Sequence, residues 1–184
     1  MLPRRRAGFT LVEAIVLVAI VGILATVAAP NLIRMQARSR AAEATTNLAQ
    51  LRDAQLAAYA ETGAFVRAGS APAGVPGSMP RSWSGGNALE FREFLGFVPD
   101  GEVFFQYGAN GAGDAFTLTA IGDVDGRGSR GQFGLVHPQP GEKYGLPHEI
   151  GTCSRRGVWN AATSSPTRLD AIGPCGPSDG RSAL

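Results

Sequence analysis

The sequence predicts an α+β fold: one long N-terminal α-helix packed on a small antiparallel β-sheet head, with a disulfide-closed loop at the C-terminus. Three observations predict it. An apolar run continues into an amphipathic helical pattern, strand-like runs separated by glycine-rich turns follow, and the only two cysteines, Cys153 and Cys175, lie in the last fifth of the chain. We expect four segments: residues 1–8 as a leader, 9–29 as a membrane-embedded helix, 30–62 as an amphipathic helix and 63–184 as the head.

The composition limits the size of the core and the class of partner. The 184 residues include 25 glycines and 12 prolines, and only 17% are charged, which indicates a loop-rich head with a modest core. The net charge is +2, and the arginines are not gathered on one face with interleaved aromatic residues, so nucleic-acid binding is not indicated. A chain that crosses a membrane carries its cysteines into an oxidising compartment, where a single disulfide is expected.

The first helix is predicted from the 21 residues Phe9 to Ala29, whose only charge is Glu13. At about 1.5 Å per residue they span roughly 31 Å, the thickness of the hydrocarbon layer of a bilayer. A carboxylate in hydrocarbon is costly unless it is neutralised or paired, so Glu13 is a candidate functional residue. The alternative is a secretory signal with a basic region at 4–6 and a cleavage site at 25–29. The length of the run, its internal acid and its continuation as a helix disfavour that alternative.

The second half of the helix is predicted from a set of mostly small or apolar residues that recur at three- and four-residue steps, while charged residues fall elsewhere. These residues are Ala41, Ala44, Leu48, Leu51, Gln55, Ala58 and Tyr59. The pattern ends near Gly63, a residue suited to a left-handed helix terminus. A helix over 9–62 is roughly 80 Å long. A head of this size does not need such a helix, so we expect one half to lie in lipid or against other subunits and the other half to pack on the head.

Two further features qualify this helix. Pro30 removes one backbone hydrogen bond and Gly22 lowers helix propensity, so Gly22 to Pro30 is the predicted kink or melting zone. Arg34, Arg38 and Arg40 follow the apolar run closely, and the basic leader must therefore dominate the orientation in the membrane. We expect this second cluster to be a solvated helix face, the alternative being an anchor in lipid headgroups.

The start of the helix resembles the class III signal of type IV pilins and pseudopilins. The matching residues are Gly8, Phe9, Thr10, Leu11 and Glu13 behind a short basic leader, together with Gly22 and Pro30. The resemblance is specific from Gly8 to about Tyr59, and beyond that it is only architectural. It implies that a membrane-embedded prepilin peptidase cuts after Gly8 and N-methylates the exposed amine of Phe9.

The resemblance also implies how the protein assembles. The new α-amine of Phe9 is a cation, so Glu13 of one subunit can pair with the N-terminus of its neighbour inside an apolar filament core. The precursor is then a single-pass protein of the bacterial inner membrane with its head in the periplasm, and an inner-membrane platform assembles it into an extracellular pilus for motility, adhesion or DNA uptake. One alternative is a pseudopilin of a type II secretion system, in a periplasmic pseudopilus. Another is a membrane-tethered periplasmic enzyme or binding protein.

The head is predicted from a change in composition after Gly63, where glycine, proline and serine become frequent. Residues 68–87 read as an irregular surface loop and 88–96 as a short helix. Strands are expected at 103–107, 116–121 and 132–136, joined by Asn-Gly, Asp-Gly and glycine-rich turns. These three form an antiparallel meander, one face of which must pack on the helix stripe at 44–59, because so small a sheet is not stable alone.

The tail after residue 138 is rich in turns, and a bridge between Cys153 and Cys175 is expected to contribute roughly 3 kcal/mol in the chain-entropy model. In the resembled pilins a similar loop is exposed on the filament surface.

Two motifs in the head suggest ligands. Residues 126–131 form a GxGxxG sequence, but a strand rather than a helix is predicted after it, which disfavours dinucleotide binding. Asp123 and Asp125 are spaced like the first ligands of a calcium loop, and Asp114 is a third candidate, although Arg127 and Gly134 occupy later ligand positions. A plain turn is favoured. We expect no cofactor and no metal. The alternative is a calcium ion, because some pseudopilins of type II secretion bind calcium in this part of the fold.

Catalysis is not predicted. His137 and His148 are eleven residues apart, and the sequence contains no HExxH, GxSxG or GxxxxGK[ST] motif. Both histidines are expected in surface or turn positions. Trp83 and Trp159 fall in polar stretches, where each is either a packed loop anchor or an adhesive contact.

Overall fold

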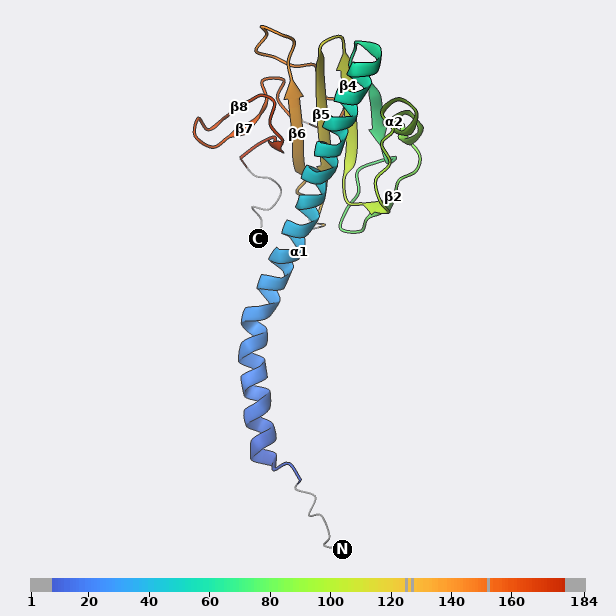
Figure 1. The fold of residues 1–184 in the computed structure, drawn as a ribbon. Helices are drawn as coiled ribbons and strands as arrows, with labels where there is room; N and C mark the ends of the chain where they lie inside the picture. Colours follow the sequence, from blue (N-terminus) through green and yellow to red (C-terminus); the bar gives the residue numbers. More distant parts are fainter. Residues whose placement is uncertain (1–7, 125, 127, 152, 178–184) are drawn as a thin grey trace, which may run out of the picture. The chain divides into compact units, whose positions relative to one another are not determined.

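A computed structural model describes residues 8–124, 126, 128–151 and 153–177, and it confirms the α+β class (Figure 1). The expected leader, apart from Gly8, lies outside these residues. The chain divides into two compact units, Met1–Gln36 and Ala37–Leu184. The elements in chain order are α1 (Leu11–Thr62), β1 (Ala68–Ala71), β2 (Arg81–Ser82), α2 (Ala88–Leu95), β3 (Glu102–Val103), β4 (Gln106–Ala112), β5 (Ala115–Gly122), β6 (Gly131–His137), β7 (Val158–Asn160), β8 (Ser165–Arg168) and β9 (Gly173–Pro174).

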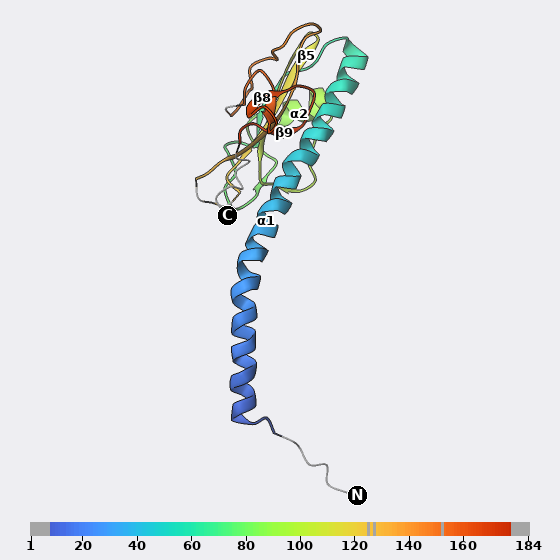
Figure 2. The same ribbon diagram turned by 90° about the vertical axis from the view of Figure 1, so that its left-hand side faces the viewer.

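The central sheet of the second unit has five antiparallel strands in the order β1-β4-β5-β6-β9. Residues 37–62 of α1 lie across one of its faces, as the two views in Figures 1 and 2 show. The predicted stripe is the contact: its members are buried except Tyr59, which is partly buried. The expected packing of the helix on the sheet is therefore confirmed.

The first predicted strand was placed too early in the sequence. Residues 102–103 form the short β3, and β4 runs from Gln106 to Ala112, through the Asn110-Gly111 pair that was expected to be a turn. The β4–β5 turn is at Gly113-Asp114, where Gly113 has a positive φ of 53°. Gly111 serves close packing instead of turning, because a Cβ there would lie 2.4 Å from the carbonyl oxygen of Val66. An Asn-Gly pair was thus misread as a hairpin signal.

The predicted irregular loop at 68–87 contains an edge strand of the sheet. Strand β1 pairs with β4, with Ala68 opposite Ala109 and Ala71 opposite Tyr107, and β2 pairs with β3. The prediction was wrong there because β1 consists of small residues without an apolar alternation. The short helix was placed correctly: α2 spans Ala88–Leu95 and ends at Gly96 in a left-handed conformation.

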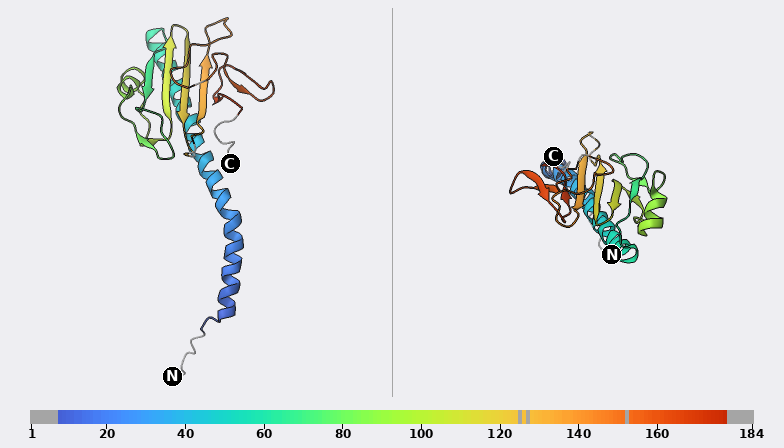
Figure 3. Two further views of the ribbon diagram at one scale, coloured as in Figure 1. Left: turned by 180° about the vertical axis from the view of Figure 1, so that it is seen from behind. Right: turned by 90° about the horizontal axis from the view of Figure 1, so that it is seen from above.

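The face of the sheet opposite α1 is covered by residues 145–151, between β6 and β7; Figure 3 gives the view from behind. Gly108 makes room for this loop, because a Cβ there would lie 3.0 Å from Cβ of Glu149 and 3.1 Å from Cγ1 of Ile150. The carbonyl oxygen of Pro147 accepts hydrogen bonds from Asn110 Nδ2 (2.8 Å) and Thr117 Oγ1 (3.0 Å). The C-terminal region therefore packs on the sheet.

Aromatic side chains make much of the core. Trp83, next to β2, packs edge-on against Phe91 at 5.3 Å and Phe97 at 5.7 Å between ring centroids. It is thus a packed anchor, the first of its two expected roles. Trp159 is partly buried in β7, so its placement in a loop was wrong.

Candidate assembly site

The N-terminal end of α1 is a capped helix start in which Glu13 takes part. The Glu13 backbone N–H donates to Thr10 Oγ1 at 3.2 Å, and the Thr10 hydroxyl donates to the Glu13 carboxylate at 3.4 Å. The helix then starts at Leu11. Threonine followed three residues later by glutamate is the capping-box pattern. This role of the pair was readable from the sequence but was missed, and it places the carboxylate beside residues 9 and 10.

The apolar first part of α1 is uncovered in the isolated chain. Its large side chains are between 50% and 75% exposed, including Leu11, Val12, Val16, Leu17 and Ile23. A continuous apolar surface of this kind marks a contact with lipid or protein. Among the described residues α1 is the one helix long and apolar enough to cross a membrane, by length and composition only, with a mean hydropathy of 2.7 over its best 18-residue window.

The predicted kink zone is α-helical from Gly22 through Pro30. The Thr26 hydroxyl donates to the carbonyl of Ile23 at 2.7 Å, a local bond that competes with the regular helix pattern. The Thr26 carbonyl itself cannot accept a bond from Pro30, which has no N–H. The zone is therefore helical in the isolated chain, and its bending or melting stays a prediction.

Arg40 is not a solvated residue, which corrects the expectation for its cluster. Its Nη1 donates to the carbonyl of Val124 at 2.8 Å, and its guanidinium lies 4.7 Å from the centroid of the Phe104 ring. Arg38 is exposed, as expected, and the side chain of Arg34 lies outside the described residues. Arg40 thus fastens the helix to the head by a hydrogen bond and a cation–π contact.

A half-buried polar network lies next to that contact. The Glu43 carboxylate accepts a bond from the Phe104 backbone N–H (3.1 Å) and one from the Tyr107 hydroxyl (3.1 Å), which in turn accepts one from Asn47 Nδ2 (2.9 Å). Burial raises the pKa of Glu43, and the bonds from Phe104 and Tyr107 only partly offset this. Burial and the nearby Glu43 charge raise the pKa of Tyr107 well above its ordinary value.

Gln55 makes a second polar contact within the apolar stripe. Its side chain is fully buried, its Oε1 accepts from the Val66 backbone N–H at 2.9 Å, and its Nε2 donates to the Val66 carbonyl at 2.6 Å. Four residues later, the Tyr59 hydroxyl donates to Asp114 at 2.7 Å. The sequence pattern placed Gln55 on the buried face correctly, but no sequence signal identified its partner eleven residues away.

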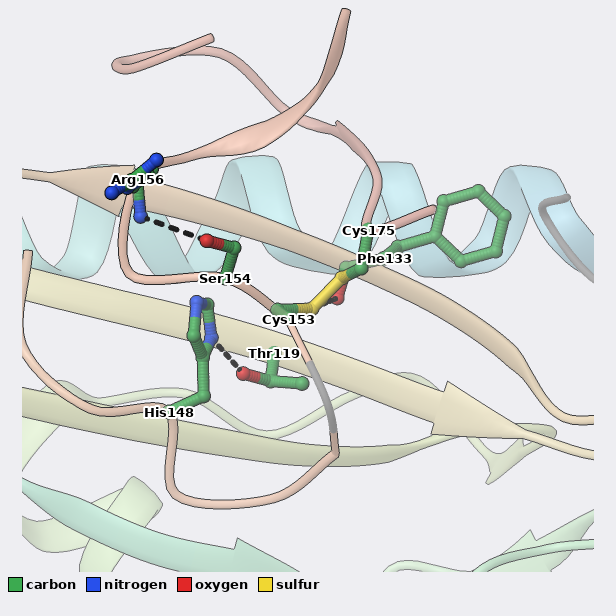
Figure 4. The surroundings of a disulfide bond; sticks show 7 residues. All are labelled: Thr119, Phe133, His148, Cys153, Ser154, Arg156 and Cys175. Atoms are coloured by element: carbon green, nitrogen blue, oxygen red, sulfur yellow. Dashed lines mark hydrogen bonds between the residues drawn. A yellow bond between two sulfur atoms is a disulfide. The ribbon is translucent and has the colours of Figure 1, made fainter. Parts of the chain in front are cut away.

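The predicted disulfide between Cys153 and Cys175 is present, with 4.8 Å between the Cα atoms (Figure 4). It lies on β6 at Gly134, where a Cβ would be 3.2 Å and 3.4 Å from the two sulfur atoms. The bridge therefore ties the C-terminal segment to the sheet. The glycine taken as evidence against a calcium loop has a packing role.

One of the two histidines, His148, differs from the surface position expected for it. His148 is largely buried and shares a hydrogen bond with the Thr119 hydroxyl (Figure 4). Its pKa is lowered to about 4, because burial penalises the imidazolium more than the backbone of Ser154 favours it. His137 is partly exposed at the end of β6, is paired with Asp170 and stacks on Phe116 at 5.1 Å.

The calcium candidates do not converge where the structure describes them. Asp114 precedes β5 and Asp123 follows it, so the eight residues of that strand separate them by about 25 Å. Asp123 Oδ2 accepts a bond from the Gly128 backbone N–H at 3.0 Å, and Asp125 lies outside the described residues. Among those residues, no group of three or more His, Cys, Asp or Glu side chains is arranged to hold a metal ion. Asp114 therefore cannot share an ion with Asp123.

Comparison with known proteins supports the resemblance of the N-terminal segment. Residues 3–29 match the family described as the prokaryotic N-terminal methylation motif. The type IV major pilin protein PilA of Myxococcus xanthus (strain DK1622) is 54% identical over 59 residues, which are 32% of this chain and 26% of that protein. No solved structure matches the chain. The resemblance to the type IV pilin family is thus confirmed, over a stretch that covers about a quarter of the length of the relative.

Proposed function

We propose that the chain is a structural subunit of a type IV pilus-like filament, held in the membrane as a precursor and polymerised through the first part of α1. The observation that carries this proposal is an exposed apolar helix inside the segment that matches the methylation motif. Its start is capped by Thr10, and its first turn contains the carboxylate of Glu13. Such a helix requires lipid before assembly and other subunits afterwards. The Myxococcus xanthus protein that the chain resembles is described as a major pilin, which favours a pilus over a secretion pseudopilus.

The proposed chemistry of assembly is the pairing of two charges. Cleavage after Gly8 gives Phe9 a cationic α-amine, and Glu13 of a neighbouring subunit supplies the anion. Burying either charge alone in an apolar core is strongly unfavourable, whereas the pair neutralises itself and fixes the axial register of one subunit on the next. The Thr10 hydroxyl donates to the same carboxylate within the chain, so Glu13 has a hydrogen-bond partner in the membrane before assembly.

The proposed role of the head is to present a surface while it stays fixed to α1. Arg40, Glu43 and Gln55 make polar contacts between helix and head, around the buried apolar stripe. Because these contacts are spread over more than four helical turns, a pull on the helix is shared among several bonds. We propose motility, adhesion or DNA uptake as the process served, through an assembly platform and a prepilin peptidase in the inner membrane.

The substitution Glu13→Leu tests the proposal in the native host. The variant chain should insert into the membrane and be cleaved, because neither step needs the carboxylate, but it should be absent from sheared filaments. Glu61→Leu is the matched control, since it makes the same chemical change at an exposed position in the last turn of α1. Incorporation of Glu13→Leu at the level of the control would show that the charge pair does not drive assembly.

A further inference from the structure

A surface groove of about 330 Å³ lies between the loop after β6 and the β7–β8 region, outside the proposed assembly helix. It is lined by Lys143, Tyr144, Arg156, Thr167 and Leu169. We infer that this groove binds a carboxylate-bearing sugar unit of an acidic polysaccharide. The inference does not depend on filament formation, because all five lining residues belong to the head.

The groove carries two uncompensated positive charges. Among the described residues, the charged members of its lining are Lys143 and Arg156. Both are exposed, and neither has a carboxylate partner in that part of the chain. The Arg156 guanidinium lies 5.5 Å from the centroid of the Tyr144 ring, and its backbone N–H is the group that donates to Ser154 Oγ at 3.2 Å (Figure 4). Stacking on the ring limits the rotamers of Arg156 and leaves its N–H groups available for an anion.

A neighbouring groove of about 430 Å³ differs in charge, because its lining contains one acidic and one basic side chain. Its lining includes both Glu142 and Arg155, so its charges balance. Arg155 Nε also donates to the carbonyl of Gly145 at 2.9 Å, so that guanidinium has a structural role. Residues 142 and 143 therefore line grooves of different charge, and of these two grooves the one at Lys143 has the net positive lining.

The rest of the lining favours an acidic sugar over other anions. Tyr144 is 48% exposed and, with Leu169, offers an apolar surface to the C–H face of a sugar ring, while Thr167 offers a hydroxyl for hydrogen bonding. A planar guanidinium binds a carboxylate through two parallel hydrogen bonds. Nucleic acid fits less well, because its binding depends on neutralising many phosphates and residues 37–184 contain 13 Lys and Arg against 14 Asp and Glu.

The groove is held in shape by covalent and hydrogen bonds near its walls. The Gly145 backbone N–H donates to the carbonyl of Arg155 at 2.7 Å, which ties the two lining segments together. Strand β7 pairs with β8, and the bridge between Cys153 and Cys175 fixes the segment that precedes β7. A site whose walls are already ordered loses less conformational entropy when it binds a ligand.

The test is a titration of the purified full-length chain in detergent micelles with tetragalacturonic acid, followed by calorimetry. Maltotetraose is the neutral sugar of equal length, and a single-stranded oligothymidylate is the competing polyanion. We expect binding of tetragalacturonic acid that weakens as salt is added, and no binding of maltotetraose. Arg156→Gln should weaken it about tenfold, the loss expected for one charge-assisted contact. Tyr144→Leu should also weaken it, while Arg92→Gln on α2, with the same loss of charge, should not.

Four results would overturn the inference. They are no binding by the unsubstituted chain, equal binding of maltotetraose, an Arg156→Gln variant that binds like the Arg92→Gln control, and binding of the oligothymidylate without binding of the acidic sugar. Unchanged circular dichroism of each variant shows that the head is still folded. If Arg156→Gln fails this check, Arg156→Lys replaces it. We expect Arg156→Lys to lose less affinity for tetragalacturonic acid, because lysine keeps the charge but not the planar guanidinium.

Discussion

The change Gln55→Leu tests whether polar contacts fix the head on α1. Gln55 is fully buried in the apolar stripe of α1, and leucine fills nearly the same volume, so the substitution removes two hydrogen bonds and little packing. It leaves both the N–H and the carbonyl of Val66 without a partner. Each partly buried group left unsatisfied costs about 1–3 kcal/mol, while burying leucine in place of an amide recovers part of that loss.

We therefore expect Gln55→Leu to lower the free energy of unfolding by roughly 2 kcal/mol, a fall in Tm of about 4–8 °C for a domain of this size. Thermal unfolding followed by circular dichroism in detergent measures it. Gln50→Leu is the matched control, because it makes the same change at an exposed position on the same helix and should stay within about 0.5 kcal/mol of the unsubstituted chain. Equal Tm values for the two variants would refute the account of Gln55.

Three further predictions concern the head and the part of α1 that packs on it. Burial raises the folded pKa of Glu43 above that of the unfolded chain, so this residue should make stability fall as pH rises through its raised pKa, and Glu43→Gln should remove that slope from a series of unfolding curves. The pKa of His148 is lowered from 6.5 to about 4, so the neutral imidazole stabilises the fold fully above pH 6.5. The free energy of unfolding should fall by about 3 kcal/mol as the pH is lowered from 6.5 to 4. A His148→Gln variant that keeps the same acid sensitivity would exclude this residue as the cause. Cys153→Ser should leave membrane insertion intact but expose the segment 145–177 to limited proteolysis, and an unchanged digestion pattern would mean that the bridge does not hold it.

The parts of the fold that the sequence predicted are those with local periodic signals. The helix, its buried stripe from Ala41 to Ala58 and the short helix at 88–95 each carry a 3.6-residue pattern or a terminating glycine. Strands β5 and β6 follow from runs of β-branched and aromatic residues. The disulfide followed from counting, since two cysteines allow one pairing.

The parts that were missed depend on contacts between distant residues. Strand β1 is made of small residues and is a strand only because β4 pairs with it. Gly134 falls inside a predicted strand and Gly108 directly follows one, and no sequence signal shows that each leaves room for a segment on the second face of the sheet. The contact of His148, which belongs to that segment, with Thr119 of β5 has no local sequence signal either. Sequence periodicity reports one buried face of an element and says little about what covers the other.

The central claim is that the chain is processed at Gly8-Phe9 and polymerises through the end that this exposes. Intact-mass analysis of filaments sheared from the cell surface tests the claim most directly. We predict a chain that starts at Phe9, carries one N-methyl group and contains an intact Cys153–Cys175 bridge. A filament-derived chain that retains residues 1–8 would contradict the claim, as would its absence from surface filaments in cells that hold the processed chain in their membranes.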